Sequence, residues 1–342
     1  MKENEQILII GDGISSWVLS YYLAKKISQI TIVSSDTAYS PCSLHSTSIN
    51  CLRGTEQGIS TLGDLICKSF EAFQKFNLEH SPDGVFEGIE YQIFNDLKKW
   101  ETRYPDYQHV ENHSLLNSHL NNFQFFYPSE AYFISPKKLK KWFFEQTPNA
   151  VREVGEVKKI TKLSDSFSVN IDDSERIFDK VFICSNYQAT KLAFGFNETL
   201  DYYLSHSKPV LGSYFEIDAN EINFSHPHSL NMALDKHHFI YRKEDNIIQI
   251  GSTSINNTID RSISEIELIK IFKEVSANIS FKLPLIEKFS AKTGMRHKGY
   301  KRLPFWGEII PGMYGMFGLY KNAYTFAFLG AIEILNQLDK ND

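Results

Sequence analysis

Residues 7–33 read ILIIGDGISSWVLSYYLAKKISQITIV, and this stretch decides the fold. The run 7–10 is apolar throughout, as expected of a strand buried on both faces of a parallel sheet. Glycines at 11 and 13 interrupt the run, and residues 14–27 then follow a helical periodicity. Residues 30–33, which read ITIV, are expected to form the next strand. A strand, a glycine turn, a helix and a strand within about 30 residues predict a βαβ unit.

The turn of this unit, GDGISS at 11–16, stands where the dinucleotide-binding pattern GxGxxG would stand. The first glycine permits a tight turn, the second allows a close backbone approach to a pyrophosphate, and the helix start offers N–H groups to phosphates. We therefore expect the pyrophosphate at Gly11, Gly13, Ile14, Ser15 and Ser16.

Two positions depart from that pattern. Ser16 replaces the third glycine, and Ser34 stands where an acidic residue would bind the ribose hydroxyls. Ser35 and Asp36 follow, and Asp36 is the candidate substitute for the missing acid. The alternative at this point is a βαβ unit that no longer binds a nucleotide.

Length and composition describe an ordinary globular protein. The chain has 342 residues, of which 42% are hydrophobic and 23% charged, enough for two or three domains or for a nucleotide domain with an insertion. Its formal charge is -5 and it has no basic stripe, so nucleic acid is not an expected partner.

The cysteine spacing and the hydropathy pattern exclude several further classes of protein. The four cysteines have no CxxC or metal-ligand spacing, and no metal site is expected. Reduced thiols fit a cytoplasmic protein. No apolar run reaches the ~18 residues of a membrane helix, and no signal peptide is apparent, so we expect a cytoplasmic location and no membrane contact.

Patterns further along the chain predict additional helices and strands. We expect helices over 61–76, 137–146, 263–276 and 324–338. Strands are expected over 82–94, 156–163, 166–171, 180–184, 210–217 and 239–251. Residues 95–124 show little periodicity and receive no assignment.

Several segments match, in order, those of a known flavoprotein family. They are DKVFICSN at 179–186, FIYRKEDNIIQIGST at 239–253, the Gly-Met-Arg at 294–296 followed by Leu303-Pro304, and GLYKNAY at 318–324. With the βαβ unit at 7–33, the chain resembles the D-amino-acid oxidase family, in particular its glycine oxidase and sarcosine oxidase branch, nearly end to end.

The resemblance implies a cofactor, FAD, and a set of residues that contact it. The implied FAD contacts beyond the glycine turn are Ser34, Ser35, Asp36, Ser43, Val157, Ser185, Asn186, Arg296, Lys321, Asn322, Ala323 and Tyr324. It also implies that Arg296 grips a substrate carboxylate, which suits a planar guanidinium able to form two parallel hydrogen bonds. Tyr241 is the second candidate catalytic residue.

The implied fold is α/β, a Rossmann-like FAD-binding domain with an interleaved, antiparallel-sheet substrate domain. Residues 1–80, 130–200 and 285–342 are assigned to the FAD-binding domain, and residues 81–129 and 201–284 to the substrate domain. The family's residues are not all kept: residues 299–302 read GYKR where the family is acidic, and His297 replaces a proline.

The expected function is oxidation of a C–N bond of a small amine or amino acid, by hydride transfer to the flavin. No acid or base is strictly needed once the amine is neutral, because the protein supplies orientation and electrostatics. Two alternatives stay open: a flavoprotein acting on a larger, peptide- or nucleotide-borne amine, and a degenerate member of the family with a binding role.

Overall fold

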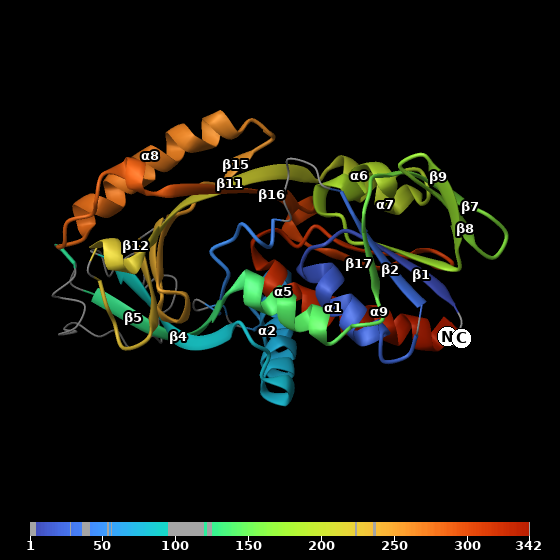
Figure 1. Ribbon diagram of the computed structural model, residues 1–342, viewed down its shortest axis with the longest axis horizontal. Helices are drawn as coiled ribbons and strands as arrows, with labels where there is room; N and C mark the ends of the chain where they lie inside the picture. Colours follow the sequence, from blue (N-terminus) through green and yellow to red (C-terminus); the bar gives the residue numbers. More distant parts are fainter. Residues whose placement is uncertain are drawn as a thin grey trace.

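The computed structural model describes residues 5–27, 29–35, 42–52, 55, 57–94, 120–121, 125–222, 224–234 and 237–341. Within these residues the chain forms three sheets, and helices pack against each of them. In Figure 1 the sheet of the βαβ unit lies at the right and a larger sheet lies at the left.

The βαβ unit lies in the middle of a six-stranded sheet with the order β17-β18-β10-β1-β2-β6. The strands from β18 to β6 are parallel, and β17 is an antiparallel edge strand. Their bounds are β1 Gln6–Ile10, β2 Gln29–Ser34, β6 Val151–Val154, β10 Lys180–Ile183, β17 Phe305–Ile310 and β18 Met313–Phe317.

Both faces of this sheet are covered, which explains the continuous apolar run of β1. Ile7 and Ile9 pack into a core with the helices of one face, and Leu8 and Ile10 pack into a second core on the other face. Helices α1 (Ile14–Leu23), α2 (Thr61–His80), α5 (Pro136–Glu145) and α9 (Ala323–Asn341) contribute to the first core. The second face carries α6 (Ala189–Leu192), α7 (Glu198–Ser205), β7 (Val157–Lys162), β8 (Phe167–Ile171) and β9 (Ser174–Phe178).

A nine-stranded sheet forms the other half of the molecule. Its order is β15-β11-β14-β13-β12-β4-β5-β3. Strands β14 and β15 pair with different parts of one edge of β11, and β16 pairs with the opposite edge. The bounds are β3 Ile49–Asn50, β4 Val85–Phe94, β5 Phe125–Ile134, β11 Lys208–Asp218, β12 Ser229–Leu234, β13 His237–Arg242, β14 Ile247–Gly251, β15 Ile255–Asn256 and β16 Ser290–Lys298.

Helix α8 (Arg261–Asn278) lies over one face of the nine-stranded sheet (Figure 1). Its Leu268, Ile271 and Val275 pack with Phe239 and Tyr241 of β13. Side chains alternate between the faces of a strand, so His238 and Arg242 project from the opposite face. We call that opposite face the inner face.

The α/β fold predicted from the sequence is confirmed, and most expected elements are present. The segment 239–251 is a hairpin of β13 and β14 rather than one strand, because Asn246 turns the chain with φ 51°. Strands β5, β16, β17 and β18 received no prediction. Both β5 and β16 pair within the nine-stranded sheet, so parts of residues 130–200 and 285–342 leave the sheet of the βαβ unit, and the division into domains stays a proposal.

Among the described residues, no helix combines the length and the apolarity that crossing a membrane requires. The same residues contain no cluster of His, Cys, Asp and Glu suited to a metal ion.

Candidate active site

A cavity of about 650 Å³ lies at the carboxyl ends of β1, β2 and β10 and extends to the inner face of the nine-stranded sheet. The carboxyl edge is where parallel α/β sheets bind ligands. Most residues that the sequence singled out line this cavity: Gly11, Gly13, Ile14, Ser15, Ser34, Ser35, Ser43, Val157, Ser185, Asn186, Arg296, Lys321, Asn322, Ala323 and Tyr324.

The glycine turn joins β1 to α1 in close contact with β10. Gly11 has φ 118°, and a Cβ atom there would lie 2.5 Å from the carbonyl oxygen of Cys184. Only glycine fits this conformation and this approach. At the start of α1, the Ile14 N–H donates to Ser43 Oγ at 3.0 Å. Ser16 is fully buried beneath the turn and does not line the cavity.

The charge of Asp12, in the middle of this turn, is compensated within the protein. Its Oδ1 accepts a hydrogen bond from Trp17 Nε1 at 2.9 Å, and its Oδ2 forms an ion pair with Lys140 of α5. Both carboxylate oxygens are therefore engaged. The positive end of the α1 dipole stays available for a phosphate beside them.

The cavity continues past the end of β2. Ser34, Ser35 and residues 155–158 line it there, and the Ser34 carbonyl accepts a hydrogen bond from Gly155 N–H at 3.0 Å. This is the end at which the adenylate of a dinucleotide would lie. Asp36, the candidate ribose ligand, lies outside the described residues, so its role stays a prediction.

Polar atoms gather where β10 ends. Ser185 is 9% exposed, and its Oγ has no hydrogen-bond partner among the described residues. Asn186 adopts φ 55°, and its side-chain amide donates to the Met295 carbonyl, which ties β10 to β16. A buried hydroxyl that lines the cavity without a partner is a group that a bound molecule would satisfy.

Arg296 on β16 projects from the inner face and is only 9% exposed. Its guanidinium lies over Gly212 of β11, where a Cβ atom would come within 2.2 Å of it. Its Nη1 donates to the Thr253 carbonyl at 3.2 Å. The described residues place no carboxylate within ion-pair distance of this guanidinium. Its charge thus faces the cavity without a counter-ion among the residues that the structure describes.

The segment 318–324 leads into α9 and closes one side of the cavity. The Tyr324 hydroxyl donates to the Ser43 carbonyl at 2.7 Å, and burial raises the pKa of that phenol. The Tyr324 carbonyl accepts from Asn50 Nδ2 at 3.0 Å. These bonds hold the start of α9 against the polar segment 42–50.

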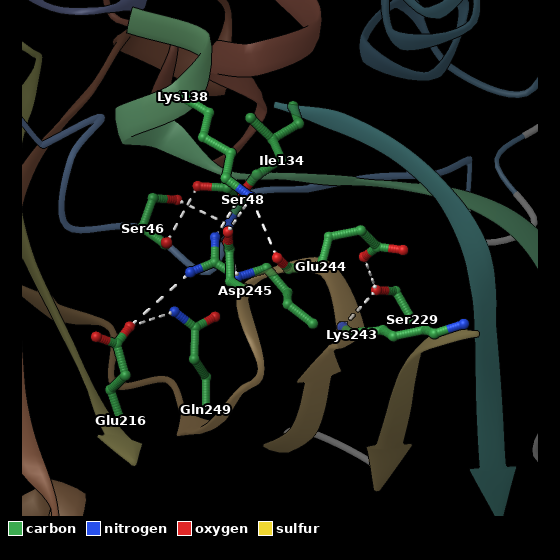
Figure 2. A network of polar contacts seen from close by, with 11 residues as sticks. Ser46, Ser48, Ile134, Lys138, Glu216, Ser229, Lys243, Glu244, Asp245 and Gln249 are labelled. Carbon is green, nitrogen blue, oxygen red and sulfur yellow. Dashed lines mark hydrogen bonds and ion pairs between the residues drawn. The ribbon is translucent and has the colours of Figure 1, made fainter. Parts of the chain in front are cut away.

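A buried arginine supports the same segment from the inner face. Arg242 is 5% exposed, and its Nη1 donates to the Ile134 carbonyl at 2.6 Å, while Ile134 N–H donates to the Ser48 carbonyl at 2.9 Å. Asp245 and Glu216 balance the charge of Arg242 at 3.4 Å and 3.9 Å. Figure 2 shows Ser46 and Ser48 on one side of this network and Glu216 on the other.

Tyr241 does not belong to the cavity. Its ring points to the α8 side of the sheet and packs 5.3 Å from the ring of Phe224, because its place on β13 has the opposite parity to His238. His238 lines the cavity instead, and Gly212 provides the space for Arg296. The sequence singled out neither residue. A glycine in the middle of a strand signals a close approach, but does not say of what.

The residues present fit an extended dinucleotide such as FAD. The cavity runs from the second strand, past the glycine turn, to the start of α9, and it passes the buried Ser185 hydroxyl, which has no hydrogen-bond partner among the described residues. Burial raises the pKa of Cys42, which lines the cavity near Arg296, so its thiol stays protonated. The groups that line the cavity include backbone N–H groups, hydroxyls, lysine ammonium groups and guanidinium groups, as suits phosphates and a flavin.

Solved structures share this architecture over the whole chain. Glycine oxidase from Bacillus cereus aligns with a TM-score of 0.75, 17% identity and coverage of 99% of this chain and 98% of that one. Iminodiacetate oxidase from a Chelativorans species aligns with a TM-score of 0.75, 13% identity, and coverage of 98% and 95%. L-α-glycerophosphate oxidase from Mycoplasma pneumoniae, solved with FAD bound, aligns with a TM-score of 0.75, 13% identity, and coverage of 99% and 95%.

Comparison with curated protein sequences gives no match. The sequence profile of one family, DAO, described as FAD dependent oxidoreductase, matches residues 6–336, which include the glycine turn, Arg296 and the start of α9. The chain therefore belongs to the DAO family of FAD-dependent oxidoreductases.

Proposed function

We propose that this flavoprotein oxidises a C–N bond of a small amine or amino acid that carries a carboxylate. The observation that carries the proposal is Arg296, a nine-tenths buried guanidinium that faces the cavity and whose only hydrogen-bond partner among the described residues is a backbone carbonyl. A buried cation without a counter-ion is unfavourable unless a ligand supplies one. A substrate carboxylate would do so with two parallel hydrogen bonds.

Bound FAD would supply the hydride acceptor for this oxidation. In the proposed arrangement, the N–H groups at Gly13 and the start of α1 bind the pyrophosphate, and Ser34, Ser35 and Val157 surround the adenylate. Ser185 Oγ, Asn186 and the start of α9, with Lys321, Asn322, Ala323 and Tyr324, bind the ribityl and flavin part.

The remaining chemistry is positioning. Arg296 orients the substrate by its carboxylate, and the buried inner face excludes water from the reacting carbon, which strengthens the ion pair. The family membership supports a flavin-dependent oxidation, and two of the similar structures are a glycine oxidase and an iminodiacetate oxidase. We also propose a cytoplasmic location, which is supported by four cysteines that form no disulfide.

Absorbance spectroscopy of the purified protein tests the proposal. We expect flavin bands, and anaerobic addition of glycine, sarcosine or a D-amino acid should bleach them. Arg296→Met should retain the flavin while the substrate concentration for half-maximal bleaching rises at least about tenfold, as for loss of hydrogen bonds to a charged group. Arg296→Lys should give an intermediate result, because it keeps the charge but loses the planar fork.

Lys292→Met is the matched control, since Lys292 lies on the same strand and the same face but does not line the cavity. It should bleach like the wild type. A yellow Arg296→Met variant with wild-type rate and affinity would remove Arg296 from substrate binding.

A further inference from the structure

A single carboxylate lies in the glycine turn at which the pyrophosphate of FAD would bind. Asp12 is the one charged residue in the sequence between positions 6 and 24, and it lines the cavity between Gly11 and Gly13. It does not cap α1, because the N-cap residue of that helix is Gly13. Since a pyrophosphate is negative, a carboxylate at this position opposes the ligand that the helix start attracts.

The dipole of α1 is too small to offset this carboxylate. The N-terminal end of a helix carries the equivalent of roughly +0.5 elementary charge, whereas an ionised carboxylate carries a full negative charge. Without a further cation, the turn would present a net negative charge to a ligand that is itself negative. The N–H groups at the start of α1 would then lose much of their attraction for phosphate.

Lys140 of α5 supplies the missing positive charge from outside the cavity. Its ammonium forms an ion pair with Asp12 Oδ2, and the lysine does not line the cavity. Contacts within the protein hold both members of the pair. Trp17 Nε1 donates to the other carboxylate oxygen at 2.9 Å, and the ammonium lies 5.1 Å from the centre of the Phe144 ring. The positive end of the α1 dipole is thus the charge that remains at the turn.

A second cation, Arg152 of β6, lies near Asp12 but makes other contacts. Its Nη1 donates to the backbone carbonyls of Thr147 and Ala150, at 3.2 Å and 3.0 Å. Among the described residues, the ion pair of Asp12 is made by Lys140 alone. Removing the charge of Lys140 should therefore leave the carboxylate facing the cavity without a paired cation.

We propose that Asp12 and Lys140 together set the affinity of the protein for FAD. The carboxylate weakens the hold of the glycine turn on the pyrophosphate, and the ammonium of Lys140 cancels that effect. Lys140 is a positioning residue, which acts through Asp12 without contacting the cofactor. The proposal rests on the pyrophosphate position given under the proposed function, and it is independent of the substrate. The pair keeps the affinity below the highest value that this turn allows.

Two substitutions and their combination test whether the affinity follows the charge. Asp12→Asn keeps the shape of the side chain and an acceptor for Trp17, and Lys140→Met keeps a similar length without the charge. We expect Lys140→Met to raise the dissociation constant for FAD at least about tenfold, and Asp12→Asn to lower it by a similar factor. The double variant, which carries neither charge, should bind FAD as the wild type does.

The dissociation constant is measured on the FAD-loaded proteins, by dilution, ultrafiltration and fluorimetry of the released flavin. Lys141→Met is the matched control, since Lys141 is the next residue of α5, is 76% exposed and pairs with Glu145. It should leave the constant unchanged.

A purely structural ion pair predicts a different order of affinities. Both single variants and the double variant would then release FAD more readily than the wild type. The proposal is overturned if Asp12→Asn binds FAD no more tightly than the wild type, or if the double variant binds it as weakly as Lys140→Met.

Gly13→Asp separates a failure of this proposal from a failure of the pyrophosphate position. Gly13 has φ -104°, and an added Cβ atom would lie 3.2 Å from Ser43 Oγ, so the fold can accept a side chain there after a small shift. The variant should lose FAD if the pyrophosphate lies over the turn. Loss of FAD, with equal affinities in the Asp12 and Lys140 series, would overturn the charge effect alone. Retained FAD would overturn the pyrophosphate position and this proposal with it.

Discussion

At the scale of single residues, Gly212 determines whether Arg296 can lie where it does. A Cβ atom at 212 would come within 2.2 Å of the guanidinium carbon, much closer than side-chain atoms approach one another. We expect Gly212→Ala to displace the guanidinium and to weaken carboxylate ligands at least about tenfold, with normal flavin content. Acetate titrated against the flavin spectrum measures this affinity.

The double variant Gly212→Ala/Arg296→Met provides the control for that substitution. The effects of substitutions at two residues in contact are not additive, so Gly212→Ala should have no further effect on acetate binding once the arginine is gone. Equal effects of Gly212→Ala in the two backgrounds would show that the alanine acts through the strand rather than through Arg296.

His297, beside Arg296, makes stability depend on pH. It is fully buried, and burial lowers its pKa to about 4, while its hydrogen bond to the Asn186 carbonyl at 3.1 Å acts in the opposite direction. The folded pKa lies below the ordinary value near 6.5, so folding favours the uncharged ring. Its contribution is complete above about pH 6.5 and is lost as the pH falls towards 4.

The gap between these two pKa values corresponds to about 3 kcal/mol of unfolding free energy. His297→Phe keeps a ring next to Phe317 but cannot take up a proton. The unfolding free energy of the variant should therefore fall less steeply between pH 6.5 and pH 4 than that of the wild type. Urea unfolding at a series of pH values between 4 and 7 measures the difference. Parallel curves for wild type and variant would contradict the assignment to His297.

At the scale of elements, α2 begins with a capping serine. Ser60 has extended backbone angles, and its Oγ accepts from Gly63 N–H at 3.0 Å. Ser60→Ala leaves that N–H without its partner and should lower the unfolding free energy by about 1 kcal/mol. Thermal unfolding measures the loss. Ser60→Asp should restore stability, and Thr61→Ala, one residue further and exposed, should have little effect.

The elements that could be predicted from sequence are those whose environment is uniform. Strands β1 and β10 are buried on both faces and read as apolar runs, while α2 and α9 have one apolar stripe. Strand β16 could not be recognised, because its inner face carries Lys292 and Arg296 and its other face carries the Thr293 hydroxyl, which bonds to Ser213. A strand that borders a ligand cavity loses the alternation that identifies a strand.

Some parts of the candidate site could likewise be predicted from the sequence, and others could not. The glycine turn was recognisable, because its φ of 118° at Gly11 and its contact with β10 depend on a local pattern of glycines. Arg296 was found through a resemblance. The contacts of Arg296 with Gly212 and of His238 with Asn231 join different strands, and no local pattern encodes such pairs. The parity that turns Tyr241 away from the cavity depends on the register of the sheet.

At the scale of the whole molecule, the cavity joins the two large sheets, so its occupant should stabilise both. We expect that removing FAD lowers the melting temperature and that adding it back restores the value. At a free FAD concentration of about 100 times Kd, the stabilisation would be about 2.7 kcal/mol. Scanning calorimetry of both forms measures it. FMN should restore less, since it lacks the adenylate that Ser34, Ser35 and Val157 would surround.

The order of the lining segments along the chain has a consequence for biosynthesis. Residues 10–15 form the first wall of the cavity and residues 316–325 the last. During translation, residues 10–15 leave the ribosome long before residues 316–325, because synthesis proceeds from the N-terminal end. A partly synthesised chain lacks the wall formed by residues 316–325, so we expect cofactor loading to wait until that segment has been translated. Flavin supply would then limit maturation after translation, and a shortage would expose newly made protein to chaperones and proteases rather than slow its synthesis.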